Sequence, residues 1–208
     1  MSLTFYYAPM STATLTELVL AELDVPCEKI KLDLKKGETK TPEYLKINPN
    51  GVVPTIVHDG TVLWESAALT IYLGETFGVE KKLFPAPGPQ RGEAMKWIVW
   101  GNATLGEAAG RFGRHTMEWF PADQKNEKAG EAAKKDIVDR LHVLDGALAG
   151  KQFLVGDYTL ADTHVHSLVD WIRFFGIDMA VYKNLEAWSS RCKARPAYVK
   201  IMSAHGAP

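Results

Sequence analysis

The chain has 208 residues, of which 46% are hydrophobic and 24% charged, and its formal net charge is −1. This composition is typical of a globular protein with a sizeable core, and the near-neutral charge argues against a nucleic-acid partner. No basic segment followed by an apolar stretch begins the chain, and no apolar run approaches the ~20 residues of a membrane span. We therefore expect a cytoplasmic protein with no membrane partner.

The cysteines and histidines give no signal for a disulfide or a metal. Cys27 and Cys192 are far apart and neither belongs to a Cys-x-x-Cys pair, so neither a disulfide framework nor a zinc site is predicted. His164 and His166 are two positions apart, which places them on opposite sides of a helix. We expect no bound metal and interpret both histidines as core or solvated residues.

Strand and helix signals alternate over the first part of the chain. Residues 3–7 are aromatic and β-branched, which predicts a buried strand, and apolar residues then recur at helical spacing up to Leu23. Residues 27–34 alternate in polarity and predict a second strand. A strand, a helix and another strand imply a right-handed crossover and parallel pairing.

This part of the chain continues with a short helix predicted over residues 41–47, where a proline takes the first position. Asp59-Gly60 joins two short apolar runs and predicts a hairpin turn. Residues 65–78 then predict another helix. The resulting order, βαβαββα, indicates an α/β domain over residues 1–80.

The second part of the chain has a different pattern. Residues 81–89 are rich in proline and predict a stiff linker, and residues 90–208 have only helical periodicity, which predicts an all-helical domain. Thr159 and Asp162 have the spacing of a capping box at the start of one helix. Two apolar stripes support the helical prediction: Ala133, Ile137, Leu141, Leu144 and Leu148, and Ala161, Val165, Leu168 and Ile172.

Hydroxyl side chains occupy the junction between the first strand and the first helix. Enzymes of thiol chemistry often carry a cysteine there, whereas this chain has Ser11 and Thr12. Either a thiol site has lost its thiol, or the site handles a sulfur that arrives with a ligand. A hydroxyl donor and a helix N-terminus would both favour a thiolate, which fits the second interpretation.

Two further segments have alternative interpretations. Pro54 enters an apolar strand, and it either starts the strand in trans or follows Val53 in a cis bond that offers the Val53 backbone to an extended peptide. Glu65 and Ser66 begin a helix, and they either cap it or hold the carboxylate and amino group of a ligand. The residues alone leave both choices open.

These segments carry a family resemblance. "YYAPMSTAT", "NPNGVVPTI" and "WESAALTIYL" closely resemble the N-terminal domain of cytosolic glutathione transferases, and "APMSTATLTELVLAEL" is most similar to the bacterial, serine-type (phi-like) kind. "FLVGDYTLADTHVHSLVDW" matches the capping-box segment of the same family. The resemblance covers the whole chain, and it implies a thioredoxin-like first domain, glutathione as co-substrate and a homodimer.

Position by position, the resemblance implies that the Ser11 hydroxyl meets the glutathione sulfur, with Thr12 as the alternative. Lys40 would approach the glycine carboxylate of the tripeptide. Two positions depart from the family pattern: Val52 replaces a common glutamine, and Thr39 replaces a common histidine.

The resemblance further implies that Val53, before a Pro54 in cis, pairs its backbone with the cysteinyl unit. Glu65 and Ser66 would bind the γ-glutamyl end. The second substrate would lie between the domains, and the candidate wall residues are Met10, Phe112, His115 and Trp119, with Met117 and Phe120 as further members.

The implied activity is glutathione transfer, in which the bound thiolate attacks a small, mostly apolar electrophile. A related variant would reduce organic hydroperoxides with glutathione. A non-catalytic protein of the same fold that binds ligands or a protein partner is the alternative class. The two arginines within "GRFGRHTMEWF" would also suit an anionic or polar electrophile.

Overall fold

The computed structural model describes residues 2–118 and 120–206. Its strands are β1 (Leu3–Tyr7), β2 (Glu28–Lys31), β3 (Thr55–His58) and β4 (Thr61–Trp64). They form one four-stranded mixed sheet with the order β2-β1-β3-β4. β1 pairs with β2 in parallel and with β3 antiparallel, which confirms the predicted parallel pairing.

β2 is shorter than the predicted segment 27–34, because the chain turns away after Leu32. The Leu32 amide donates to the Tyr7 carbonyl at 2.8 Å, and the Asp33 carboxylate then accepts from the amides two and three positions ahead. An aspartate bonded in this way forms a turn and ends the ladder. The predicted hairpin turn at Asp59-Gly60 is confirmed.

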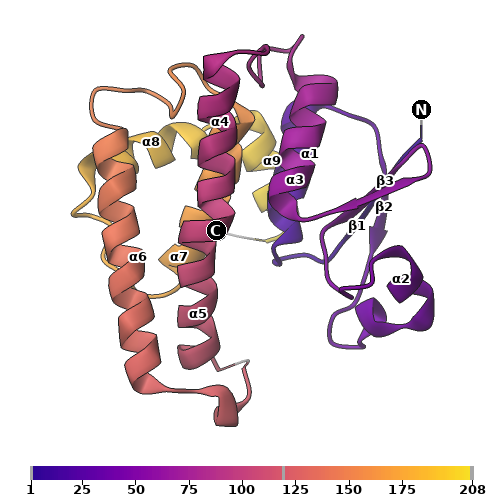
Figure 1. Cartoon of the computed structure of the whole chain (residues 1–208), viewed down its shortest axis with the longest axis horizontal. Helices are drawn as coiled ribbons and strands as arrows, with labels where there is room; N and C mark the ends of the chain where they lie inside the picture. The colour runs from indigo at the N-terminus through magenta and orange to yellow at the C-terminus, as the bar shows by residue number, and fades with distance from the viewer. Residues whose placement is uncertain (1, 119, 207–208) are drawn as a thin grey trace.

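Helices cover both faces of the sheet. They are α1 (Ala13–Leu23), η1 (Glu38–Lys40), α2 (Pro42–Ile47), α3 (Ser66–Leu73) and a π-helical continuation, η2 (Gly74–Gly78). α1 and α3 lie on the face toward the second half of the chain, and α2 lies on the other side (Figure 1). The Thr41 hydroxyl accepts from the Tyr44 amide at 3.3 Å and caps α2 at the predicted position.

The second half is helical, as predicted. Its segments are α4 (Pro89–Trp100), the π-helical η3 (Gly101–Gly106), α5 (Glu107–Thr116), η4 (Ala122–Gln124), α6 (Glu127–Ala147), α7 (Leu160–Arg173), α8 (Lys183–Lys193) and α9 (Pro196–Ala204). The predicted stripe along α6 is fully buried. The stripe along α7 is buried except at Leu168, which lines a cavity between the two halves of the molecule.

The predicted capping box begins α7 and has a second use. The Asp162 carboxylate accepts from the Thr159 amide at 2.9 Å, and its other oxygen accepts from the Leu154 amide and the Trp188 indole, each at 2.9 Å. Asp162 is fully buried. A buried carboxylate is tolerated only when such donors surround it, so this residue joins α7, α8 and the preceding loop.

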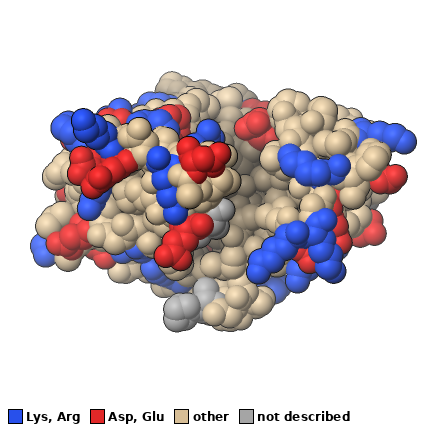
Figure 2. Space-filling view, turned by 90° about the horizontal axis from the view of Figure 1, so that it is seen from below, with Lys and Arg blue, Asp and Glu red and all other residues tan. Residues whose placement is uncertain are grey.

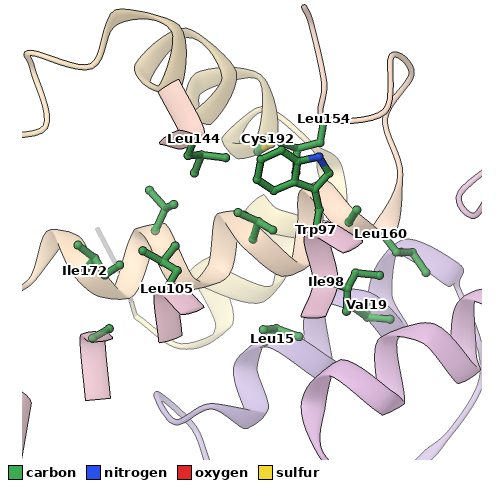
Figure 3. Close-up of a cluster of buried hydrophobic side chains, with 14 of the residues drawn as sticks. Leu15, Val19, Trp97, Ile98, Leu105, Leu144, Leu154, Leu160, Ile172 and Cys192 are labelled. Carbon is green, nitrogen blue, oxygen red and sulfur yellow. The ribbon is translucent and has the colours of Figure 1, made fainter. Parts of the chain in front are cut away.

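α1 joins the two halves of the molecule. Figure 3 shows its Leu15 and Val19 directed toward a cluster that includes Ile98 of α4 and Leu160 of α7. All four side chains are buried, and burying each contributes about 1.5–3 kcal/mol. The two halves therefore share one core, and the N-terminus of α1 is held in a fixed place between them.

The histidines of α7 are core residues. His166 Nε2 lies 3.0 Å from Ser189 Oγ, and His164 lies between Thr70 and Asn102. Burial lowers the pKa of His164 to about 3 and that of His166 to about 4. Within residues 2–118 and 120–206, no group of three potential ligand side chains could hold a metal, and no helix is long and apolar enough to cross a bilayer.

The two neutral histidines should make the protein acid-sensitive. Their pKa values are lower in the folded chain than the ~6.5 of an unfolded chain, so protons bind the unfolded state first and stability falls as the pH drops below about 6.5. Between pH 7 and 5 the free energy of unfolding should fall by about 2 kcal/mol per histidine. Urea unfolding at both pH values measures this loss. His166→Gln should reduce it by about one histidine's share, and a pH-independent urea midpoint in the wild type would contradict the expectation.

Candidate active site

A cavity of about 650 Å³ lies between the two halves of the molecule. One wall comes from the start of α1 and from Ser66 at the start of α3. The opposite walls come from η3, α5, α7 and α9. Figure 2 shows a hollow between two lobes, and much of its visible floor consists of residues other than Lys, Arg, Asp and Glu.

Ser11 and Thr12 both line this cavity at the N-terminus of α1. The Ser11 hydroxyl donates to the Ala8 carbonyl at 2.7 Å and accepts from the Ala13 amide at 3.1 Å. The Thr12 hydroxyl donates to the Val53 carbonyl at 3.0 Å. Both hydroxyls are therefore held in place, one within its own turn and the other across to the loop before β3.

The loop before β3 has the backbone geometry that the resemblance implies. The Val53–Pro54 bond is cis. Val53 is buried, and its carbonyl accepts the hydrogen bond from Thr12. Lys40, at the end of η1, donates from Nζ to the Asn50 carbonyl of the same loop at 3.2 Å. The loop thus brings a cation close to the strand entry.

Buried polar side chains hold this loop from behind. Asn48 donates from Nδ2 to the Val52 carbonyl at 3.0 Å and to the Thr55 hydroxyl at 2.9 Å, and the Tyr44 hydroxyl donates to the same carbonyl at 2.7 Å. The two residues that depart from the family pattern, Val52 and Thr39, differ in their exposure. Val52 is exposed, whereas Thr39 is buried and presents nothing to the cavity.

The start of α3 forms the other predicted part of the site. Glu65 precedes the helix with φ 72°, a left-handed conformation that is uncommon for residues other than glycine. Such backbone conformations are concentrated at functional sites. Ser66 faces the cavity, where its hydroxyl oxygen accepts from Asn102 Nδ2 at 2.9 Å. The first-turn amides of α3 have no partner within the helix itself.

The predicted wall of the second-substrate site is only partly brought together. Met10 and Phe120 line the cavity, and Met10 is 56% exposed. Phe112 is buried in the core of the second half, where it contacts Phe175. His115 points elsewhere, with Nδ1 2.9 Å from the Gln124 carbonyl oxygen. Neither of these two residues lines the cavity.

The other two candidates for the predicted wall are Met117 and Trp119. Met117 is half-buried beside the core and is not a lining residue. Trp119 lies outside the described residues. The α5 face that does meet the cavity carries Glu107 and Gly110, next to Gly106 at the end of η3, and Phe112 is about 140° around the helix from Glu107.

Several cavity residues were not predicted. α7 supplies Ser167, Leu168, Asp170 and Trp171, the next residue after its end supplies Phe174, and α9 supplies Tyr198 and Met202. The Tyr198 hydroxyl donates to Asp170 Oδ2 at 2.5 Å, and burial together with this carboxylate raises the pKa of Tyr198. Asp170 in turn pairs with Lys193 and Arg173 at 3.1 and 3.3 Å. Only the spacing along α7 could have indicated part of this set.

Known proteins resemble the chain over nearly its whole length. Residues 1–75 match the family model of the glutathione S-transferase N-terminal domain, and residues 109–196 match that of the C-terminal domain. The chain is 31% identical over 193 residues to the glutathione S-transferase GstB of Escherichia coli (strain K12), an alignment that covers 89% of each protein.

Solved structures agree with these matches. The glutathione transferase URE2P6 from Phanerochaete chrysosporium, in complex with oxidized glutathione, superposes with a TM-score of 0.89 at 27% identity, over 99% of this chain and 96% of that one. A glutathione transferase homolog from Lodderomyces elongisporus, with two glutathione molecules per subunit, has a TM-score of 0.89 at 26% identity, over 98% and 99%. With its thioredoxin-like first domain and helical second domain, the chain belongs to the glutathione transferase family.

Proposed function

We propose that this glutathione transferase binds reduced glutathione beside α1 and conjugates its sulfur to a small, uncharged and mostly apolar electrophile in the interdomain cavity. One observation carries the proposal: the hydroxyls at the start of α1 and the apolar side chains of α7 and α9 line the same cavity. Two substrates held there react as one bound pair, which replaces a collision in solution. Two structural relatives bind this tripeptide, one of them as reduced glutathione and the other as its disulfide, which supports glutathione as the co-substrate.

In this proposal the tripeptide lies along the loop before β3. The Val53 amide has no hydrogen-bond partner within the described part of the chain, so it is available to the cysteinyl carbonyl. Lys40 lies beside the same loop and would pair with the glycine carboxylate. Glu65 would take the amino group of the γ-glutamyl end, and Ser66 would take its carboxylate.

The start of α1 would lower the pKa of the bound thiol. A free thiol has a pKa of ~8.5, so only a few per cent is thiolate at neutral pH. The Thr12 amide makes no hydrogen bond within residues 2–118 and 120–206, and it lies at the positive end of a helix. Ser11 would exchange its bond to Ala8 for one to the sulfur. Lowering the pKa by ~2 units requires about 2.7 kcal/mol, which such a bond and the helix dipole can supply together.

The reaction then needs no base from the protein. The thiol proton leaves to solvent when glutathione binds, and the thiolate electron pair forms the new carbon–sulfur bond. The leaving group departs with the electron pair of the broken bond. When the acceptor is a conjugated double bond, the electron pair moves onto its electron-withdrawing group, and the resulting anion takes a proton from water. Ser11 is an activator in this scheme and forms no covalent bond.

Removing the Ser11 hydroxyl should raise the kinetic pKa. At saturating glutathione, we expect kcat/KM of the wild type for 1-chloro-2,4-dinitrobenzene to rise with an apparent pKa near ~6.5, the pKa of the bound thiol. Ser11→Ala should move this pKa up by about one unit and lower kcat/KM at pH 6.5 by about five- to tenfold. The pH profile of kcat/KM measures both effects.

Thr12→Val is the matched control for this experiment. It keeps Ser11 and removes only the bond to the Val53 carbonyl, so the KM for glutathione should rise while the kinetic pKa stays unchanged. A pKa shift in Thr12→Val but not in Ser11→Ala would mean that Thr12 is the activating hydroxyl. Glutathione binding without conjugation of any tested electrophile would favour the non-catalytic alternative.

The cavity favours an electrophile without negative charge. Among the described lining residues the charged side chains are Glu107 and Asp170, and no lysine or arginine is present. Arg111, one turn after Glu107 on α5, is not a lining residue. It pairs with Glu107 at 2.6 Å and with Asp136 at 2.7 Å. Arg114 is not a lining residue either, so the two arginines of this segment give no support to an anionic substrate.

Two dyes that differ by one sulfonate can test this preference. N-phenyl-1-naphthylamine should bind at least about fivefold tighter than 8-anilinonaphthalene-1-sulfonate, a difference of roughly 1 kcal/mol at a partly solvated site. Fluorescence titration gives both affinities. Glu107→Gln should strengthen binding of the sulfonate and leave the neutral dye unchanged, whereas the exposed control Glu131→Gln should change neither. Tighter binding of the sulfonate to the wild type would contradict the assignment.

The other expectations from the sequence stay predictions. They are the homodimer, the cytoplasmic location, the division into residues 1–80, 81–89 and 90–208, and the choice between conjugation and hydroperoxide reduction as the physiological reaction.

A further inference from the structure

The wall of the cavity opposite the start of α1 contains a tyrosine–aspartate pair. Tyr198 of α9 and Asp170 of α7 both line the cavity, and the Tyr198 hydroxyl lies 2.5 Å from Asp170 Oδ2. The Asp170 side chain is only 14% exposed. Because both partners line the cavity, their hydrogen bond forms part of the wall that a second substrate would meet.

The direction of this hydrogen bond follows from the charges around it. Lys193 Nζ and Arg173 Nε lie 3.1 and 3.3 Å from Asp170 Oδ1, as expected for an ionised carboxylate. An ionised carboxylate only accepts hydrogen bonds, so the Tyr198 hydroxyl is the donor. Burial and this carboxylate raise the pKa of Tyr198, so the phenol stays neutral and its proton stays on the bond to Asp170.

The Tyr198 oxygen is therefore an acceptor toward the cavity. Its proton is used by Asp170, and no hydrogen bond to this oxygen is made within the described part of the chain. Both oxygens of Asp170 are engaged, one by Tyr198 and the other by the two cations. A hydroxyl that donates to a charged acceptor is polarised, which makes its own oxygen a stronger acceptor. Of this pair, the Tyr198 oxygen is the atom left for a ligand.

A second hydroxyl on this wall has the same character. Ser167 is three positions before Asp170, so the two residues lie on one face of α7. The Ser167 hydroxyl donates to the Thr163 carbonyl at 2.9 Å, so its proton is also used. Trp171 lines the cavity too, and its indole nitrogen can only donate. The hydroxyl oxygens of this wall thus offer lone pairs, and no free hydroxyl proton, to a bound substrate.

We infer that Tyr198 is a specificity-determining residue whose oxygen accepts a hydrogen bond from an uncharged N–H or O–H group of the electrophile. The inference rests on the proposed conjugation and narrows its substrates to apolar electrophiles that carry one such donor. The donor is uncharged because Lys193 and Arg173 already balance the charge of Asp170.

An electrophile without this donor would be disfavoured at the same place. A carbonyl or ether oxygen there would set lone pairs against lone pairs, and it would displace water from Tyr198 without replacing the hydrogen bond of that water. Because its proton is directed at Asp170, Tyr198 would select among substrates and would not act as an acid on them.

Two electrophiles that differ in one group test this selectivity. N-methyl-4-chloro-3,5-dinitrobenzamide has an N–H where methyl 4-chloro-3,5-dinitrobenzoate has an ester oxygen, and both lose chloride to the glutathione sulfur. At saturating glutathione, kcat/KM for each compound is divided by the rate constant of the same reaction without protein, which corrects for their different reactivities. The wild type should prefer the amide at least about fivefold by this ratio, as expected for one neutral hydrogen bond.

Three variants locate the contact. Tyr198→Phe removes the acceptor oxygen and should reduce the preference to less than about twofold, through loss of activity with the amide. Ser167→Ala should retain at least about half of the preference, because the carboxylate makes the Tyr198 oxygen the stronger acceptor.

Tyr72→Phe is the matched control. The Tyr72 hydroxyl lies 2.6 Å from His58 Nδ1, and Tyr72 is not a lining residue, so its removal should leave the preference of the wild type. Each result is a ratio between two electrophiles on one enzyme sample, so it does not depend on the fraction of the variant that is folded.

Three outcomes would overturn the inference. Equal normalised activities of the wild type with the amide and the ester would mean that the wall does not select for a donor. A full preference in Tyr198→Phe, or loss of the preference in Ser167→Ala alone, would mean that the contact lies elsewhere. If the wild type conjugates no electrophile, including 1-chloro-2,4-dinitrobenzene, the proposed function fails first, and this result is distinguishable from activity without a preference.

Discussion

The packing of α1 between the sheet and the helical domain is the constraint on which the rest of the structure depends. On one side, Leu15 and Val19 are buried in the core that both domains share. Near the other end, the buried Glu22 carboxylate accepts from Arg195 Nε at 3.0 Å and from the Tyr158 hydroxyl at 3.0 Å. An apolar contact and a paired buried charge therefore fix the same helix.

This placement decides where the chemistry can occur. Ser11, Thr12 and Thr14 at the start of α1 line the cavity in which we propose that the second substrate lies, and the Thr12 amide has no hydrogen-bond partner among the described residues. The Thr12 bond to Val53 links that turn to the loop before β3, and Asn102 links the helical domain to Ser66. In the proposed function this site needs no cysteine of its own, because the sulfur would arrive with glutathione. Of the two cysteines, Cys192 is buried, and burial raises the pKa of both thiols.

Local signals in the sequence predicted most of the fold. Asp59-Gly60 specifies its hairpin, and the spacing of Thr159 and Asp162 specifies the start of α7, because turns and caps depend on residues a few positions apart. The second use of Asp162, as acceptor for the Trp188 indole, was invisible, since 26 positions separate the two residues.

Candidate residues for the glutathione side of the site could be named from the sequence because each of their motifs is contiguous, and Ser11, Thr12 and Ser66 line the cavity. Its far wall could not, because Tyr198 and Asp170 meet through tertiary packing alone. Aromatic content also misled at α5: Phe112 fills the core, while Glu107 and Gly110 form the cavity face of that helix. The position of Asn102 in the cavity could not be predicted either, because no sequence pattern marks this residue.

The most direct test of this account is the titration of bound glutathione by ultraviolet difference absorbance of the thiolate. The wild type should bind glutathione and titrate its thiol about two pH units below the value in free solution. A bound thiol that keeps its solution pKa would contradict the central claim that the start of α1 activates the sulfur of the ligand.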